Sequence, residues 1–175
     1  ATRAPIPMIL ATGAVHSHLV RQQLRTFASV NVASGECLDV HHFAVLIGCG
    51  ATTVNAYVAE EAIAERHDRG LLSGLTLIEA VANYRKAVED GLLKIMSKMG
   101  ISVIASYRGG YNFEALGLSR ALVAKFFPPM SSRISGLGLT GIASRVTQMH
   151  KKAFEMADVF LPVGGFFRYR RSGER

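Results

Sequence analysis

Two histidines, His16 and His18, stand one residue apart just after a short apolar run near the start of the sequence. Imidazole is a common ligand of catalytic divalent metals, so a His-x-His pair after a strand suggests a metal site. Glu36 is the only plausible further ligand at the ends of the later predicted strands. Residues two apart on a helix also point in different directions. We therefore interpret both histidines as helix-surface or interface residues, and a small metal-dependent hydrolase using His16 and His18 is the alternative.

The segment that most resembles a binding site is the loop 106–112, where Arg108 precedes two glycines. Glycines can leave backbone N–H groups open to an anion, and Arg108 could bind a phosphate or a carboxylate. The same arginine could instead pair with a carboxylate of a neighbouring domain. We expect interdomain contacts from Arg108, Tyr111 and Asn112, and no catalytic residue.

Residues 136–141 read G-x-G-x-x-G ahead of a predicted helix. Glycines in this pattern let a dinucleotide pyrophosphate approach a helix N-terminus, but the pattern requires a preceding buried strand. Residues 128–133 do not read as one, so we interpret the motif as a glycine-rich turn. Two cysteines, Cys37 and Cys49, exclude a disulfide scaffold and a four-cysteine metal site, and we expect buried, reduced thiols. We therefore expect neither cofactor nor metal in this chain.

The elements that would position these residues alternate between strand and helix. A Thr76–Glu79 capping box opens one helix, and Ser119 caps another that ends at Pro128. Alternation of this kind predicts a parallel sheet, either half of an eight-stranded β/α barrel or a small open doubly wound sheet. The predicted strands are 6–11, 27–33, 52–56 and 101–104, and the predicted helices include 14–24, 38–48, 57–69 and 139–156.

The amino-acid composition restricts the classes of protein to which this chain can belong. The chain has 175 residues, of which 49% are hydrophobic and 19% charged, which excludes intrinsic disorder. The mean hydropathy of +0.23 suggests surface that other parts of a protein cover. No apolar run approaches the ~18 residues of a membrane span, and no stretch resembles a signal peptide, so we expect a cytoplasmic protein without a membrane partner.

The net charge of +7 is concentrated at the end of the chain, where Arg168, Arg170, Arg171 and Arg175 accompany one glutamate. A basic tail can bind phosphates, or it can be a piece of chain whose acidic neighbours are missing. We expect domain contacts rather than a nucleic-acid partner. The chain starts without methionine and stops on this polar run, so we also expect it to be part of a larger protein.

Several unusual strings resemble the latter part of the central domain of glutamate synthase large subunits. They are 8–21 (MILATGAVHSHLVR), 42–48, 51–57, 91–102 (GLLKIMSKMGIS), 106–110 (SYRGG) and 113–115. The resemblance covers essentially the whole chain and is nearer to the bacterial NADPH-dependent type than to ferredoxin-dependent enzymes.

The resemblance implies a large subunit that makes L-glutamate from L-glutamine and 2-oxoglutarate, with reductive transfer of channelled ammonia. In that family an amidotransferase domain precedes the central domain, and an FMN-binding barrel that also holds a 3Fe–4S cluster follows it. A small subunit supplies FAD, 4Fe–4S clusters and NADPH. The central domain resembles a degenerate barrel without a cofactor of its own, so we predict an α/β fold whose four β/α units form half of a degenerate TIM-like barrel.

Carried over residue by residue, the resemblance gives this chain no catalytic role. Position 1 is Ala1 instead of the family's nucleophilic cysteine, and two cysteines do not fit a three-cysteine cluster. We predict that residues 1–167 belong to the central domain and that 168–175 form a basic linker toward the FMN-binding domain. The expected partners are the amidotransferase and FMN-binding domains and the small subunit, and the isolated segment is expected to self-associate through open strand edges.

Overall fold

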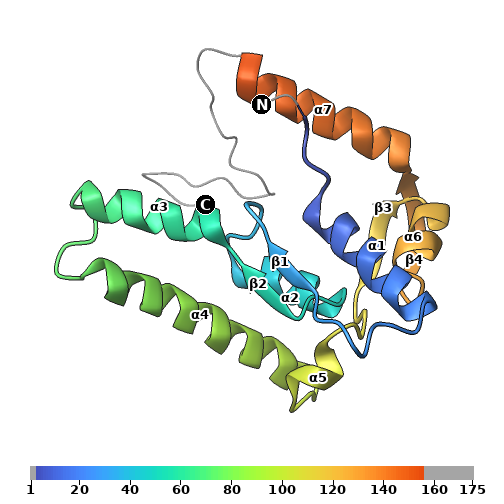
Figure 1. Ribbon diagram of the computed structural model, residues 1–175, viewed down its shortest axis with the longest axis horizontal. Coiled ribbons are helices and arrows are strands. Elements are labelled where there is room, and N and C mark those ends of the chain that lie inside the picture. The colour runs from blue at the N-terminus through green and yellow to red at the C-terminus, as the bar shows by residue number, and fades with distance from the viewer. Residues whose placement is uncertain (1–2, 156–175) are drawn as a thin grey trace, which may run out of the picture.

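The computed structural model describes residues 3–155, and every structural statement below concerns these residues. The chain builds helices and strands in the order α1 Met8–Arg21, β1 Asn31–Ala33, α2 Val40–Gly48, β2 Thr53–Asn55, α3 Tyr57–Asp68, α4 Leu77–Lys98, α5 Ile104–Tyr107, β3 Glu114–Leu118, α6 Arg120–Phe126, β4 Ser131–Leu137 and α7 Leu139–Glu155 (Figure 1). Within this part, no helix is long and apolar enough to cross a membrane.

The strands form two separate parallel pairs. In the first pair β1 lies beside β2, with Val32 opposite Val54. In the second pair β3 lies beside β4, with Leu116 opposite Ile134 and irregular register on either side. Helices α2 and α6 connect the members of each pair, so the chain contains two βαβ units and is an α/β protein, as the alternation predicts.

The prediction of one four-stranded sheet is wrong for residues 3–155. The apolar run predicted as the first strand belongs to helix α1, which begins at Met8 after Pro7 and runs to Arg21. Residues 101–104, predicted as the fourth strand, form no strand and lead into the short helix α5. Strands β3 and β4 were not predicted. The four-unit half barrel is therefore replaced by two two-stranded sheets.

Helix α1 begins at Met8, before the predicted start at residue 14, and its N-terminus is capped by a residue distant in the sequence. Pro7 provides no side-chain cap, but a carboxylate oxygen of Glu36 accepts a hydrogen bond from Met8 N at 3.1 Å. A carboxylate at a helix N-terminus satisfies a free N–H group and complements the helix dipole. Glu36, the proposed extra metal ligand, therefore serves as a helix cap.

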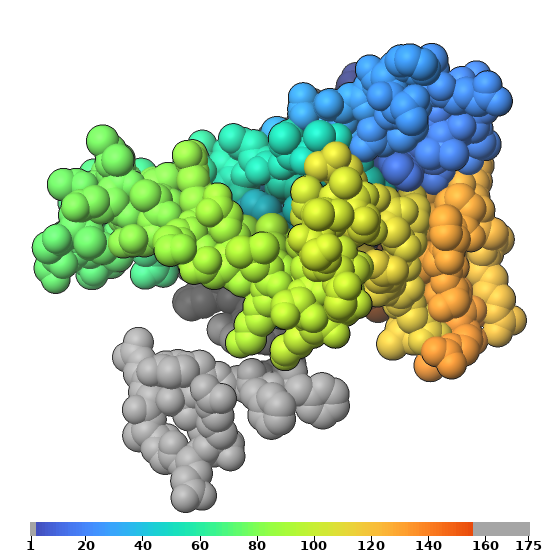
Figure 2. Space-filling model, turned by 90° about the horizontal axis from the view of Figure 1, so that it is seen from below, coloured from blue at the N-terminus to red at the C-terminus, as the bar shows by residue number. Residues whose placement is uncertain are grey.

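Helices α3 and α4 lie side by side and reach away from the sheets (Figures 1 and 2). The predicted capping box is confirmed, with Thr76 and Glu79 each accepting from the other's backbone N–H. The helix then continues without a break through Asp90 and Gly91 to Lys98. Gly91 is needed for close packing, since a Cβ there would lie 2.6 Å from Val40 Cγ2.

Three apolar clusters form the core. One joins β1, α2 and α4 around Val32, Phe43 and Leu46. A second joins the end of α2 to α6 around Cys49, Val123 and Phe127. The third packs Tyr107 and Met96 against α2. Helix α2 contributes to all three clusters and is the centre of the molecule.

Candidate functional site

The C-terminus of α2 gathers the polar residues most capable of chemistry. Arg25, in the segment between α1 and β1, donates from Nε to His16 Nδ1 at 3.0 Å. Its other nitrogens donate to Ala28 O at 2.6 Å, to Gly50 O at 2.9 Å and to Thr52 Oγ1 at 3.3 Å. A guanidinium just beyond the last turn of a helix complements the negative end of the helix dipole. Arg25 thus ties α1, the end of α2 and the start of β2 together.

The loop after α5 covers the same helix end. Gly109 N donates to Ile47 O at 3.0 Å, and Tyr111 N donates to Gly48 O at 3.1 Å. Both carbonyls belong to the last turn of α2, where the helix itself leaves C=O groups free. Ile47 O also accepts from Gly50 N at 2.9 Å, whereas Tyr111 N is the partner that the loop supplies to Gly48 O. The backbone N–H groups of Gly109 and Tyr111, which were expected to be open to an anion, are therefore used within the fold.

His16 fills the space between the helix end and this loop. A Cβ on Gly50 would overlap the imidazole ring, and a Cβ on Gly109 would lie 3.0 Å from its Cε1. The ring also meets Tyr111 edge-on, at 5.8 Å between centroids. Burial, followed by the positive charge of Arg25, lowers the pKa of His16 below its usual value. His16 is therefore a neutral hydrogen-bond acceptor, as its bond from Arg25 requires.

This geometry does not support the hydrolase alternative. Nδ1 of His16 faces a guanidinium, while the side chain of His18 is exposed. In the part of the chain that the structure describes, no three His, Cys, Asp or Glu side chains are grouped so that they could hold a metal ion. The structure places His16 against the end of α2 and the loop after α5, and it places the side chain of His18 on the exposed surface of α1.

The residues predicted for interdomain contact fall into three groups. Arg108 is half-buried and borders an open hollow beside His16 and Arg25. Tyr111 is buried, with a φ of 49° and its ring edge-on to Phe127, and burial raises its pKa. Asn112 is exposed. Tyr111 is thus part of the core, whereas Arg108 and Asn112 remain accessible, and the predicted contacts Arg168, Arg170 and Arg171 lie outside the described residues.

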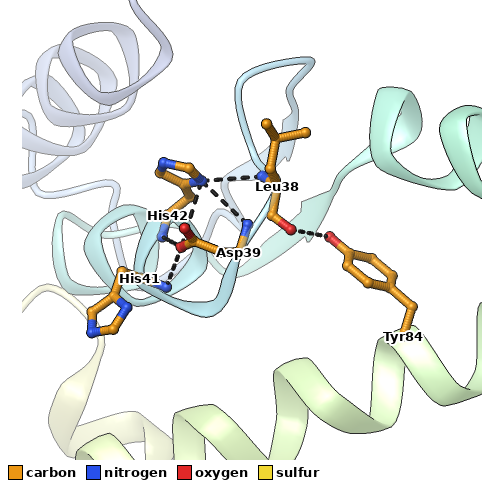
Figure 3. Close-up of polar contacts among 5 residues, drawn as sticks. All are labelled: Leu38, Asp39, His41, His42 and Tyr84. Carbon is orange, nitrogen blue, oxygen red and sulfur yellow. Dashed lines mark hydrogen bonds and ion pairs between the residues drawn. The ribbon is translucent and has the colours of Figure 1, made fainter. Parts of the chain in front are cut away.

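Two further histidines, His41 and His42, lie at the other end of α2, where Asp39 is the N-cap (Figure 3). Asp39 Oδ1 accepts from His41 N and His42 N, and His42 Nδ1 in return accepts from Asp39 N at 3.3 Å and Leu38 N at 3.1 Å. This is a capping box in which histidine takes the place of the usual Glu or Gln. His42 therefore has a structural role.

The G-x-G-x-x-G run spans the end of β4, Gly138 and the first turn of α7. Residues 131–137 do form a strand, but it is not the buried strand that a dinucleotide site requires, as predicted. That strand is almost entirely exposed. Gly136 serves strand pairing, because a Cβ there would overlap the backbone of Gly117 in β3. The prediction of a glycine-rich turn is wrong, because only Gly138 separates β4 from α7, although the run does lead into the last helix.

Both cysteines are free and buried, as predicted. Burial raises the pKa of Cys49 to about 12, and it also raises the pKa of Cys37. A thiol that resists deprotonation is a poor nucleophile and a poor metal ligand. The cysteines are therefore packing residues.

Sequence analysis missed Arg25, the residue that organises this site. It stands alone in an irregular segment, and its partners come from three separate parts of the chain. The available signal was weak: a single arginine shortly after a predicted helix and nine residues after His16.

Comparisons with known proteins give a consistent result. Residues 1–119 match a family model described as the glutamate synthase central domain. The chain is 67% identical over 173 residues to a glutamate synthase [NADPH] large chain of Azospirillum brasilense, covering 99% of this chain and 11% of that protein. It is 42% identical over 173 residues to the corresponding large chain of Bacillus subtilis, covering 97% and 11%.

A ferredoxin-dependent glutamate synthase of Pyropia yezoensis is also similar, at 42% identity over 184 residues, covering 98% of this chain and 12% of that protein. The chain therefore spans roughly a tenth of the length of these relatives.

Proposed function

The chain belongs to the glutamate synthase central domain family, and from this premise we propose that it is a non-catalytic, structural segment of a glutamate synthase large chain. The observation that carries the proposal is the 67% identity to the NADPH-dependent relative across 99% of the chain. The site geometry supports it, because His16, Arg25 and the glycine loop are engaged in holding α2 in place.

We propose that the whole protein makes L-glutamate from L-glutamine and 2-oxoglutarate with reductive transfer of channelled ammonia, and that NADPH is its electron source. FMN and a 3Fe–4S cluster would belong to another domain of the large chain, with FAD and 4Fe–4S clusters in a small subunit. The residues of this chain do not fit these groups. A three-cysteine cluster needs one more cysteine than the chain has, and burial raises the pKa of Cys49 to about 12.

We propose that residues 1–167 lie in the central domain and that 168–175 form a basic linker to the FMN-binding domain. The amidotransferase domain, the FMN-binding domain and the small subunit would be the partners. The two βαβ units would be the part that this chain contributes to a degenerate barrel. Contacts would come from Arg108 and Asn112 and from the arginines near the chain end.

The apolar face of α7 provides the sharpest test of a structural role. Replacing the exposed Met149 with glutamate would place a charge on that face, and Gln148→Glu on the same helix is the matched control. In the whole enzyme we expect Met149→Glu to raise the amount of glutamine hydrolysed per glutamate formed, while glutamine hydrolysis and ammonia-dependent synthesis each persist. Loss of either reaction itself in a folded variant, or behaviour identical to Gln148→Glu, would contradict the proposal.

The isolated segment offers a second test. Exposed apolar residues on β3, β4 and α7 favour self-association, because such surface is rarely left open on a monomer. We expect dimers or larger species by sedimentation velocity at micromolar concentration. A strictly monomeric segment that binds no hydrophobic dye would show that this face needs no partner.

A further inference from the structure

An open hollow of about 430 Å³ lies beside the end of α2, on the side where β1 and β2 begin. Arg25, Arg108 and His16 line its polar part, and Phe27, Ala28 and Ala105 line its apolar part. The segment around α5 and the segment before β1 lie next to each other on this face (Figure 2). The hollow thus joins two positive charges to a small apolar wall.

The two arginines differ in how far their hydrogen-bonding capacity is used. Arg25 donates to four acceptors within the fold. The Nε of Arg108 is buried and has no hydrogen-bond partner among the described residues. Neither arginine forms an ion pair with a carboxylate in this part of the chain. Leaving a buried donor without a partner costs the fold free energy.

We propose that this hollow is a carboxylate-binding site in which Arg108 provides the two-pronged hydrogen bond. A guanidinium matches the two oxygens of a carboxylate in one plane. A phosphate site usually adds several backbone N–H groups, and here those of Gly109 and Tyr111 are already bonded to α2. Phe27, 86% exposed at the rim, can pack over the carbon chain of the bound acid.

The carboxylate can come from two sources with the same chemistry. One is an Asp or Glu side chain of another domain, a case that rests on the proposed structural role in a large chain. The other is a free small carboxylic acid, which would make the hollow a ligand site independent of that role. The hollow has room for either, and Arg108 would bind both in the same way.

Hydrogen exchange of peptides covering 104–112 and 25–30 in the whole large chain tests the proposal. The variants are Arg108→Met, Arg108→Lys and the matched control Arg66→Met, whose arginine is exposed on α3. If an acidic side chain occupies the hollow, Arg108→Met speeds exchange in these peptides several-fold. Arg108→Lys, which keeps the charge but not the fork, speeds it less, and Arg66→Met leaves it unchanged.

Added glutarate and inorganic phosphate separate the remaining cases. If the ligand is a free carboxylate, Arg108→Met alone does not speed exchange, but glutarate slows it in the wild type and not in Arg108→Met. If no acceptor binds Arg108, we expect Arg108→Met to slow hydrogen exchange rather than speed it. Removing an unpartnered buried donor stabilises the loop. Unchanged or slower exchange in Arg108→Met with no glutarate effect, or protection by phosphate alone, overturns the proposal. The test of the proposed function with Met149→Glu measures the glutamine hydrolysed per glutamate formed, and its outcome does not depend on whether this hollow binds a carboxylate.

Discussion

Helices α2 and α7 show how differently two helices of one chain can be packed. Five of the nine residues of α2 are buried. A local capping box of Asp39 and His42 closes its N-terminus, and Arg25 and the loop after α5 cover its C-terminal end. None of the 17 residues of α7 is buried. Met149 and Phe154 are 70% and 61% exposed, and Figure 1 shows α7 at the edge of the molecule beyond β4.

The contrast follows the boundary of the family match. Helix α2 lies within residues 1–119, which match the central-domain model, and α7 lies after them. Helix α7 still carries an apolar stripe, with Ile142, Val146 and Met149 at helical spacing. An amphipathic pattern therefore predicts that a face is covered, but it does not identify the part of the protein that covers it.

The largest effect is expected at Gly50, which ends the turn after α2. Its φ is +113°, and a Cβ would overlap the ring of His16. Strain and overlap together should make Gly50→Ala cost about 4 kcal/mol of unfolding free energy. Gly70→Ala, at φ +68° but with nothing within 4 Å, should cost only about 1 kcal/mol. Denaturant unfolding of both variants measures the difference in unfolding free energy. Equal losses of unfolding free energy would contradict the claim that the His16 ring fills the space beside Gly50.

A pair of leucine truncations sharpens the comparison of the helices themselves. Leu46 in α2 is 4% exposed, whereas Leu139 in α7 is 49% exposed. We expect Leu46→Ala to cost about 3 kcal/mol because it leaves a cavity, and Leu139→Ala to cost less than about 1 kcal/mol in the isolated chain. Denaturant midpoints measure both, and similar costs would show that α7 is packed as tightly as α2.

The neutral state of His16 predicts a pH dependence of stability. Its pKa in the fold lies below the unfolded value of 6.5, so well above pH 6.5 both states are neutral and the contribution of His16 to stability is fully present. As pH falls below 6.5 the unfolded state binds the proton more readily, and unfolding becomes easier. We expect His16→Asn to flatten this slope and the exposed control His18→Asn to leave it intact. If the unfolding free energy of His16→Asn depends on pH as steeply as that of the wild type, the pH dependence comes from another group.

The smallest effect is expected at the start of α2. His42→Ala removes the acceptor for Asp39 N and should cost about 0.5–1 kcal/mol. His42→Gln preserves a capping box and should be nearly neutral. His41→Ala, which removes an exposed side chain outside the cap, serves as the control. Thermal unfolding at pH 8 would measure all three variants. If His42→Gln lost as much stability as His42→Ala, the capping role of the His42 side chain would be contradicted.

Capping residues and hydrophobic periodicity in the sequence predicted those helices whose ends are set by residues close in the sequence. The capping residues Thr76 and Ser119 marked α4 and α6, and periodicity marked α2, α3 and α7. The apolar run at 6–11 is compatible with strand or helix, and the cap that decides it, Glu36, lies 28 residues away from Met8. Strands β3 and β4 were missed because Gly117 and Gly136 weaken any strand pattern, while their pairing depends on contacts distant in sequence.

The candidate site was only partly predictable for the same reason. Sequence analysis selected His16 and Arg108 separately, each from a local motif. Nothing local indicated that His16 would accept a hydrogen bond from Arg25, or that Arg108 would line the same hollow, because both depend on tertiary packing. The motif also could not show that α2 would use the N–H groups of the glycine loop.

The most direct measurement is hydrogen exchange of α2 and α7 in two settings: the 175-residue chain, diluted until sedimentation shows monomers, and the whole large chain. Because α2 is buried by its own domain, residues 40–48 should exchange slowly in both settings. Residues 139–155 should exchange quickly in the isolated chain. In the large chain they should exchange several-fold more slowly, because we propose that other domains cover the apolar stripe there. Equal exchange of α7 in the two settings would contradict the account of this chain as a segment whose exposed face is covered by its parent protein.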